Sequence, residues 1–231
     1  MAVYRFLHPI VNWLARLLAR VDVRGAEHMP RAGAVLLVSN HLTNYDPMIV
    51  GMVFKRVIHF MGKVELYSNP VLAWLWLQLQ SFPVRRGEVD RAALRHAEDL
   101  LKSGRVVGLF PEGHRSRDGA MQAAQPGIAL IARRTGAPIL PVAITGTEHL
   151  MPPALWRWRP WRRPTITITV GAPFTLPSHS GRGDYAALTE HIMARVAALL
   201  PPAYRGAYRG AYAEAIEGRD AAEGAHARGR M

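Results

Sequence analysis

A histidine and an aspartate stand five positions apart in one short polar stretch, residues 39–47 (SNHLTNYDP). A carboxylate close to an imidazole fixes the tautomer of the ring and stabilises its protonated form, which is how a general base is made. His41 could therefore take a proton from a hydroxyl group while Asp46 orients the ring. The plainer interpretation of the same residues is that Asp46 caps a helix and His41 is an ordinary loop histidine.

A second stretch, residues 110–116 (FPEGHRS), carries a glutamate, a glycine and an arginine in close succession. His-x4-Asp followed by Phe-Pro-Glu-Gly-x-Arg-Ser resembles the glycerolipid acyltransferase family, whose best-known members are the 1-acyl-glycerol-3-phosphate acyltransferases. Each half of the pattern alone is a weak signal, whereas the two halves in this order are specific. The resemblance extends from Val21 to Gly171.

This resemblance implies a reaction and a set of substrates. A fatty acyl group would move from a thioester of coenzyme A or acyl carrier protein to the free hydroxyl of lysophosphatidic acid, giving phosphatidic acid. The alternatives are an acyltransferase for another lysophospholipid or for glycerol-3-phosphate, and a non-catalytic phospholipid-binding protein of the same fold. The presence of both His41 and Asp46 disfavours the non-catalytic alternative.

The resemblance also implies roles for particular residues. His41 would be the general base and Asp46 its partner, and the substrate-binding residues would be Lys63, Arg85, Arg86, Glu112, Gly113 and Arg115. Arginine suits an acceptor that carries a phosphate, because its guanidinium group can donate two hydrogen bonds to one phosphate. These cations could equally be solvated surface charges. Glu112 could position the backbone, bind the glycerol of the acceptor, or simply tie down its loop.

Two absences bear on the chemistry. The chain has no cysteine and no Gly-x-Ser-x-Gly motif, so an acyl-cysteine intermediate is excluded and a serine hydrolase is disfavoured. Direct attack of the substrate hydroxyl on the thioester is then the most economical reaction. We expect no metal site and no cofactor besides the thioester co-substrate. The family usually has threonine where this chain has His114, which leaves the acceptor geometry open.

The composition indicates a globular protein with an anionic partner. The chain has 231 residues, a mean hydropathy near zero and a formal net charge of +12. A basic balance suits phospholipid headgroups, nucleic acid or phosphorylated substrates. A nucleic-acid-binding protein would leave both loop motifs unexplained. The expected partners are therefore the lipid substrate, the thioester carrier and a membrane surface, and not nucleic acid.

Strand and helix patterns alternate along the chain. Strands are predicted at 21–24, 34–38, 57–61, 81–84, 106–110, 138–144 and 165–170, and helices at 48–54, 70–80, 90–102, 127–135 and 184–200. This order predicts an α/β fold with a mixed, largely parallel sheet flanked by helices. Ligands in such folds bind at the carboxyl ends of strands, and both motifs directly follow predicted strands.

We expect three regions: a membrane-associating amphipathic helix at 1–20, an acyltransferase domain at 21–200 and a low-complexity, flexible tail at 201–231. The first segment could instead pack as a surface helix on its own domain. The stripe at 156–163 (WRWRPWRR) could dock on a membrane, bind single-stranded nucleic acid or pack as a loop, and we favour the membrane. No stretch has the length of a clean transmembrane helix. The expected location is peripheral, on the cytoplasmic face of the cell membrane.

Overall fold

The computed structural model describes residues 2–85, 90–116, 118–150, 163–176 and 185–210. A seven-stranded sheet lies at its centre, in the order β1-β7-β6-β2-β5-β3-β4. All neighbouring strands are parallel except β6 and β7, which are antiparallel. The strands are β1 (Arg20–Arg24), β2 (Val35–Ser39), β3 (Ile58–Lys63), β4 (Phe82–Val84), β5 (Val106–Leu109), β6 (Ile139–Thr145) and β7 (Thr165–Val170). The predicted α/β fold with a mixed, largely parallel sheet is confirmed.

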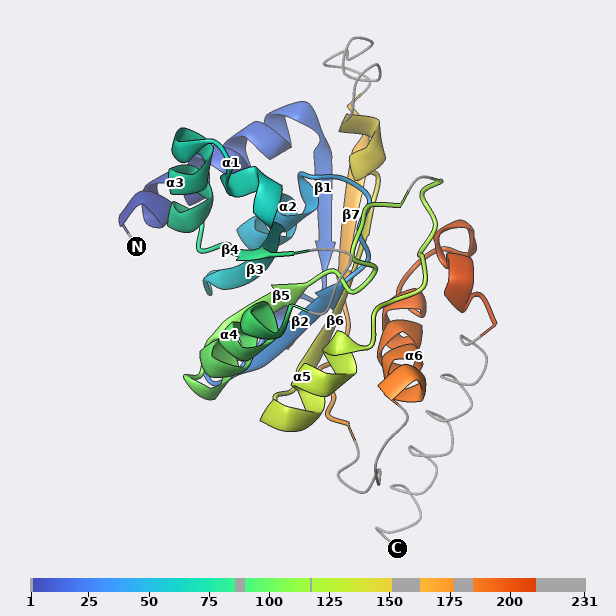
Figure 1. The fold of residues 1–231 in the computed structure, drawn as a ribbon. Coiled ribbons are helices and arrows are strands. Elements are labelled where there is room, and N and C mark those ends of the chain that lie inside the picture. The colour runs from blue at the N-terminus through green and yellow to red at the C-terminus, as the bar shows by residue number, and fades with distance from the viewer. Residues whose placement is uncertain (1, 86–89, 117, 151–162, 177–184, 211–231) are drawn as a thin grey trace, which may run out of the picture.

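Helices cover both faces of this sheet (Figure 1). They are α1 (Ala2–Leu18), α2 (Asp46–Val53), α3 (Pro70–Gln78), α4 (Arg91–Lys102), α5 (Gly127–Thr135) and α6 (Tyr185–Ala197). One core cluster joins α4, α5 and α6 to strand residues such as Leu36 and Val38, and the other joins α1 and α2 to Val35 and Leu37. Because successive strand residues point to opposite faces, β2 is apolar on both sides and fully buried.

Several helix ends lie where local sequence signals predicted them. The Asn69 side chain accepts hydrogen bonds from the amides of Val71 and Leu72 at the start of α3, and Asp90 caps α4 in the same way. Helix α5 ends at Thr135, and the next residue, Gly136, has a φ of 61°. This left-handed conformation favours glycine, so the helix stops there.

The chain after α6 returns to the domain. It forms two short 3-10 turns, η6 (Pro202–Tyr204) and η7 (Gly206–Tyr208). The amide of Met121 donates to the carbonyl of Tyr204, and the amide of Ala207 donates to the carbonyl of Met121. In Figure 1 this segment, drawn in red, lies beside the yellow-green loop that precedes α5. Residues 201–210 therefore form turns that contact the domain, and residues 211–231 lie outside the described part of the chain.

Candidate active site

The two sequence motifs meet at one edge of the sheet. Strands β2 and β5 are parallel neighbours, so the segments that follow them leave the sheet on the same side. The amide of His41, after β2, donates to Glu112 Oε1, after β5, at 3.0 Å. The amide of Ser116 donates to the carbonyl of His41 at 2.8 Å. The two loops therefore form a single site.

His41 and Asp46 form a buried pair in this site. Nδ1 of His41 lies 2.9 Å from Oδ2 of Asp46, and the two side chains are 5% and 0% exposed. A carboxylate has no proton to donate in this bond, so the proton lies on Nδ1 and the lone pair of the ring lies on Nε2. The ring of His41 lines a cavity, where Nε2 can accept a proton from a substrate hydroxyl.

Asp46 accepts five hydrogen bonds, which fix its carboxylate beside the ring. Besides Nδ1 of His41, Oδ2 accepts the amides of Leu42 at 2.6 Å and Thr43 at 2.7 Å, and Oδ1 accepts the hydroxyls of Thr43 at 2.9 Å and Thr147 at 2.7 Å. The interpretation of Asp46 as a helix cap is wrong. Helix α2 begins at Asp46 itself, and no side chain caps it, because the carboxylate is directed back toward the histidine loop.

Asn40 and Thr147 also hold the site, and neither was predicted from the sequence. Asn40 is 1% exposed; its Nδ2 donates to the carbonyl of Ile144 and its Oδ1 accepts the amide of Ile144, each at 2.9 Å. This pair of bonds joins the end of β2 to β6. The position of Asn40, between a buried strand and His41, could have indicated this role from the sequence. Thr147 lies 101 positions from Asp46, so no local pattern indicated it.

Glu112 is buried, and its carboxylate joins two loops. It is 1% exposed, and Oε2 accepts the amide of Gln122 at 2.9 Å while Oε1 accepts that of His41. Burial raises the pKa of Glu112 from 4.5 to about 7; the charges of Asp46 and Asp118 add to this rise, and the two amide hydrogen bonds oppose it. Because both oxygens are directed at backbone amides, Glu112 positions the loop that carries His41.

Aromatic rings from β3 and from the end of β5 support the imidazole. The ring centroids of His41 and Phe110 lie 4.3 Å apart at an interplanar angle of 25°, and those of Phe110 and Phe60 lie 5.6 Å apart. Gly108 leaves room for this stack, since a Cβ at that position would lie 2.3 Å from the ring of Phe60. The stack limits how far the plane of the His41 ring can tilt.

A cavity of about 100 Å³ lies beside His41. Its walls come from α1, α2, α3, β3 and the segments next to them, which are grouped at the upper left of Figure 1. Most of the lining is apolar and includes Val11, Met48, Phe60, Leu66 and Leu79. An apolar cavity next to the candidate base His41 suits a substrate with a hydrocarbon chain.

The sequence model of a family described as Acyltransferase matches residues 20–145. The chain belongs to the acyltransferase family. It is 32% identical over 164 residues to "1-acyl-sn-glycerol-3-phosphate acyltransferase BAT2, chloroplastic" of Brassica napus, covering 64% of this chain and 46% of that acyltransferase. It is 29% identical over 139 residues to "1-acyl-sn-glycerol-3-phosphate acyltransferase" of Borreliella burgdorferi, covering 59% of this chain and 55% of that acyltransferase. The chain thus spans about half the length of these curated relatives.

A solved acyltransferase has a similar fold. The crystal structure of "the 1-acyl-sn-glycerophosphate (LPA) acyltransferase, PlsC, from Thermotoga maritima" superposes with a TM-score of 0.64 and 26% sequence identity. The likeness covers 84% of this chain and 78% of that acyltransferase. The mixed sheet and its flanking helices are therefore the fold of this acyltransferase family.

The family resemblance implied three cations in the acceptor site that precede the second motif in the chain: Lys63, Arg85 and Arg86. Lys63 lines the cavity, and its Nζ lies 3.3 Å from Oε1 of Glu65. Arg85 is exposed, and its amide donates to Oδ2 of Asp90 at 2.9 Å. Arg86 lies outside the described residues. The structure therefore brings Lys63 to the cavity beside His41 and leaves the side chain of Arg85 in solvent.

The second motif places its glycine and arginine beside the histidine loop. Gly113 has a φ of 72°, and its amide donates to the carbonyl of Phe110 at 3.1 Å. This tight turn leads to Arg115, which is exposed and directly precedes the Ser116 amide that bonds the carbonyl of His41. Arg115 is therefore anchored next to the candidate base through its backbone neighbour.

Across the described residues, no group of three or more histidine and carboxylate side chains is arranged to hold a metal ion. Within the same ranges, none of the helices combines the length and the apolar character needed to cross a membrane.

Proposed function

We propose that this protein transfers a fatty acyl group from an acyl-CoA or acyl-carrier-protein thioester to the free hydroxyl of 1-acyl-glycerol-3-phosphate. The observation that carries the proposal is the buried His41–Asp46 pair at the wall of an apolar cavity. The names of the related acyltransferases support the same acceptor. The thioester is the only co-substrate that this reaction needs.

In the proposed reaction, His41 Nε2 takes the proton of the acceptor hydroxyl while the hydroxyl oxygen attacks the thioester carbonyl carbon. The resulting tetrahedral intermediate collapses, the C–S bond breaks, and the protonated ring returns its proton to the leaving thiolate. Asp46 lies 2.9 Å from Nδ1 and stabilises the ring during the time that it carries a positive charge. The products are the acylated lipid and the free thiol, and the enzyme is unchanged.

The acceptor's phosphate calls for cations near the base. Lys63 lines the cavity, and Arg115 directly precedes Ser116, whose amide donates to the carbonyl of His41. A guanidinium group can bind one phosphate with two hydrogen bonds, which would also orient the glycerol hydroxyl toward the ring. We assign Arg115 and Lys63 to the phosphate, and the sequence resemblance adds Arg85 and Arg86 as further candidate cations for the acceptor.

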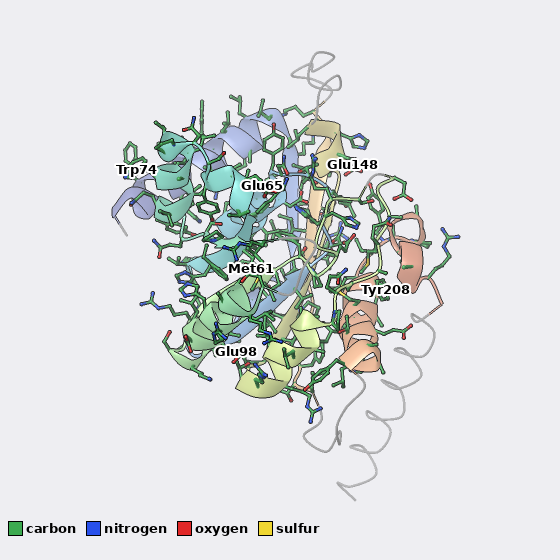
Figure 2. The ribbon with its side chains drawn as sticks, viewed as in Figure 1. Met61, Glu65, Trp74, Glu98, Glu148 and Tyr208 are labelled. Atoms are coloured by element: carbon green, nitrogen blue, oxygen red, sulfur yellow. The ribbon has the colours of Figure 1, made fainter. Side chains whose placement is uncertain are left out.

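We place the protein peripherally on the cytoplasmic face of the cell membrane. The proposed substrates are lipids, and two exposed apolar helix surfaces support binding to a membrane. Helix α1 packs through Ala15 and exposes Phe6 and Trp13, which are 68% and 65% accessible. On α3, Val71 is 74% and Trp74 55% accessible, and Figure 2 shows Trp74 on the outer side of the helix. Both helices also line the cavity. Lipid could therefore reach the cavity from the surface that these side chains form.

The Trp/Arg stripe at 156–163 adds to this proposal only as a sequence feature. Residues 156–162 lie outside the described part of the chain. Arg163 is described, and its Nη1 donates to the carbonyl of Arg16 in α1 at 2.9 Å. The stripe therefore ends against the same helix that exposes Phe6 and Trp13.

The test is acyl transfer by purified protein, comparing wild type with His41→Ala. Lysophosphatidic acid is offered with acyl-CoA and, separately, with acyl carrier protein thioester, and phosphatidic acid is measured. His96→Ala is a matched control, because His96 is exposed on α4, on the other side of the sheet from the cavity. We expect wild type and the control to form product and His41→Ala to form none.

Other outcomes separate the alternatives. Transfer only to another lysophospholipid or to glycerol-3-phosphate would keep the reaction and change the acceptor. Binding of phospholipid without transfer from either thioester would identify a non-catalytic lipid-binding protein. Full activity in His41→Ala would refute the assignment of the base.

A further inference from the structure

One of the bonds that fix the Asp46 carboxylate comes from a distant segment of the chain. Four of its five hydrogen bonds are donated by residues 41–43, which belong to the same loop as Asp46 and move with it. The fifth is donated by Thr147, which lies 101 positions away; its hydroxyl is 2.7 Å from Oδ1. Thr147 is 0% exposed. Its bond therefore ties the carboxylate to a separate part of the fold.

The end of β6 determines where the Thr147 hydroxyl lies. The strand ends at Thr145, and Gly146 follows with a φ of 87°. A Cβ at Gly146 would lie 2.1 Å from the carbonyl oxygen of Thr165, so only glycine fits this turn. The turn leads directly into the 3-10 turn η3 (Thr147–Leu150). Thr147 is therefore placed by the backbone of a buried strand and not by the His41 loop.

A second contact holds η3 from the C-terminal segment. Tyr204 Oη donates to Oε1 of Glu148, the residue after Thr147, which is labelled in Figure 2. The backbone of Gly146, the residue before Thr147, also bonds this hydroxyl group. Burial raises the pKa of Tyr204 to about 12, and the bond to Glu148 adds to the rise, so the hydroxyl keeps its proton near neutral pH. Tyr204 thus contacts both chain neighbours of Thr147.

We propose that Thr147 is a positioning residue for the candidate base and that Tyr204 supports it. Thr147 acts through Asp46: its bond to Oδ1 holds the carboxylate so that Oδ2 stays in line with Nδ1 of His41 during proton transfer. Neither Thr147 nor Tyr204 is among the described residues that line the cavity beside His41. The effect on catalysis rests on the proposed acyl transfer, whereas the effect on the bond between His41 and Asp46 does not require turnover.

The first experiment compares Thr147→Val and Thr147→Ser with wild type in the acyl-transfer assay, at a temperature well below the melting temperature of each variant. Valine has nearly the shape of threonine but no hydroxyl, whereas serine keeps the hydroxyl. Because Thr147→Val removes one hydrogen bond to a charged group, we expect kcat to fall about tenfold at an unchanged KM. Thr147→Ser should stay near wild type.

Thr189→Val is the matched control, because Thr189 is also buried but its hydroxyl donates to the carbonyl of Tyr185 within α6. It should keep the kcat of wild type. A kcat in Thr147→Val that equals that of wild type would overturn the inference. An equal loss of kcat in Thr147→Val and Thr189→Val would also overturn it, because the loss would then reflect stability and not the position of the base.

Tyr204→Phe tests the support from the C-terminal segment. It removes the hydroxyl that bonds Glu148 and should lower kcat about threefold. Because Tyr204 acts through Thr147, the double variant Thr147→Val/Tyr204→Phe should be no slower than Thr147→Val alone. Losses that multiply in the double variant would overturn the role of Tyr204.

Proton NMR gives a readout that needs no substrate. The proton on Nδ1 of His41, which is shared with Asp46, should resonate far downfield, and its signal is assigned by its absence in His41→Ala. We expect this signal in wild type, Thr147→Ser and Thr189→Val, and its broadening or loss in Thr147→Val. An unchanged signal in Thr147→Val would overturn the inference whether or not the protein transfers acyl groups. Absence of transfer by wild type would instead refute the proposed function, and a signal lost only in Thr147→Val would still support the positioning role.

Discussion

Replacing Asp46 by asparagine should separate the charge of this residue from its structural role. The amide oxygen of Asn can take the place of Oδ2, where it would accept Nδ1–H of His41 and the amides of Leu42 and Thr43. The amide nitrogen would then face the hydroxyls of Thr43 and Thr147, which can rotate to accept. The hydrogen-bond network and the fold should therefore be retained.

What the variant loses is the attraction between the carboxylate and the protonated ring. With Nδ1 and Oδ2 2.9 Å apart, the two charge centres lie roughly 4 Å apart, and such a pair is worth about 4 kcal/mol at an effective dielectric constant of about 20. The ring carries its full charge only after it takes the proton, so this energy is lost from the transition state. We expect kcat/KM to fall about 10³-fold.

The assay is acyl transfer from acyl-CoA to lysophosphatidic acid, with a thermal melt on the same preparations. Asp46→Ala is the comparison, because it leaves all five donors without an acceptor and should lower the free energy of unfolding by about 3–5 kcal/mol. The expected pattern for Asp46→Asn is a normal melt with very low activity. An Asp46→Asn enzyme within tenfold of wild type would refute the argument that the charge of Asp46 stabilises the protonated ring.

Three further predictions concern stability. The pKa of Glu112 is raised from 4.5 to about 7 in the fold, so between these pH values the folded state holds a proton that the unfolded chain releases. The free energy of unfolding should therefore fall by about 3 kcal/mol as the pH rises from below 4.5 to above 7. Urea titrations at several pH values should show a weaker dependence of this free energy on pH for Glu112→Gln. Asn40→Ala should cost about 2–4 kcal/mol in the same titration, because both backbone groups of Ile144 lose their partner; an unchanged midpoint would contradict this role. Tyr208→Phe should lower Tm by about 2–4 °C, because the amide of Ala124 loses its acceptor at 2.8 Å; a calorimetric scan that matches wild type would argue against it.

The elements that the sequence predicted well are those whose signals are local. Asn69 before Pro70 marks the start of α3, and Gly136 marks the end of α5, because caps are formed by residues one or two positions from the helix end. The reversal at β7 was not predicted. Its antiparallel pairing with β6, from Val142↔Val170 to Thr145↔Thr167, depends on where a distant segment returns to the sheet.

The residues that would carry out the chemistry were predictable from the sequence, whereas the residues that hold them in place were harder to predict. The types and spacing of His41 and Asp46 indicated a base and its partner, and the family resemblance added weight to them and named Glu112, whose role it left open. The role of Asp46 in its helix was misjudged, because an aspartate before a proline at a helix start favours capping unless stronger donors compete. Here two backbone amides and the hydroxyl of Thr147 compete successfully.

The low-complexity sequence after α6 illustrates the limit of composition as a guide. Tyr204 and Tyr208 come from a run of Ala-Tyr-Arg-Gly that composition alone marks as flexible. In the fold, Tyr204 Oη donates to Oε1 of Glu148, and Tyr208, labelled in Figure 2, is 6% exposed. An aromatic ring with a hydroxyl can bury its face and still pair its polar end, so even widely spaced tyrosines can hold a segment in place.

These contacts join the C-terminal segment to the candidate base through a short series of bonds. The carbonyl of Tyr204 accepts the amide of Met121, and the next residue, Gln122, donates its own amide to Glu112. The other oxygen of Glu112 accepts the amide of His41. A displaced C-terminal segment would therefore loosen the loop that holds Glu112 before it reached the ring. Asp46 orients the imidazole from within the loop that carries His41. Glu112 and the C-terminal segment determine the position of that loop. Different residues therefore control the orientation and the position of the candidate base.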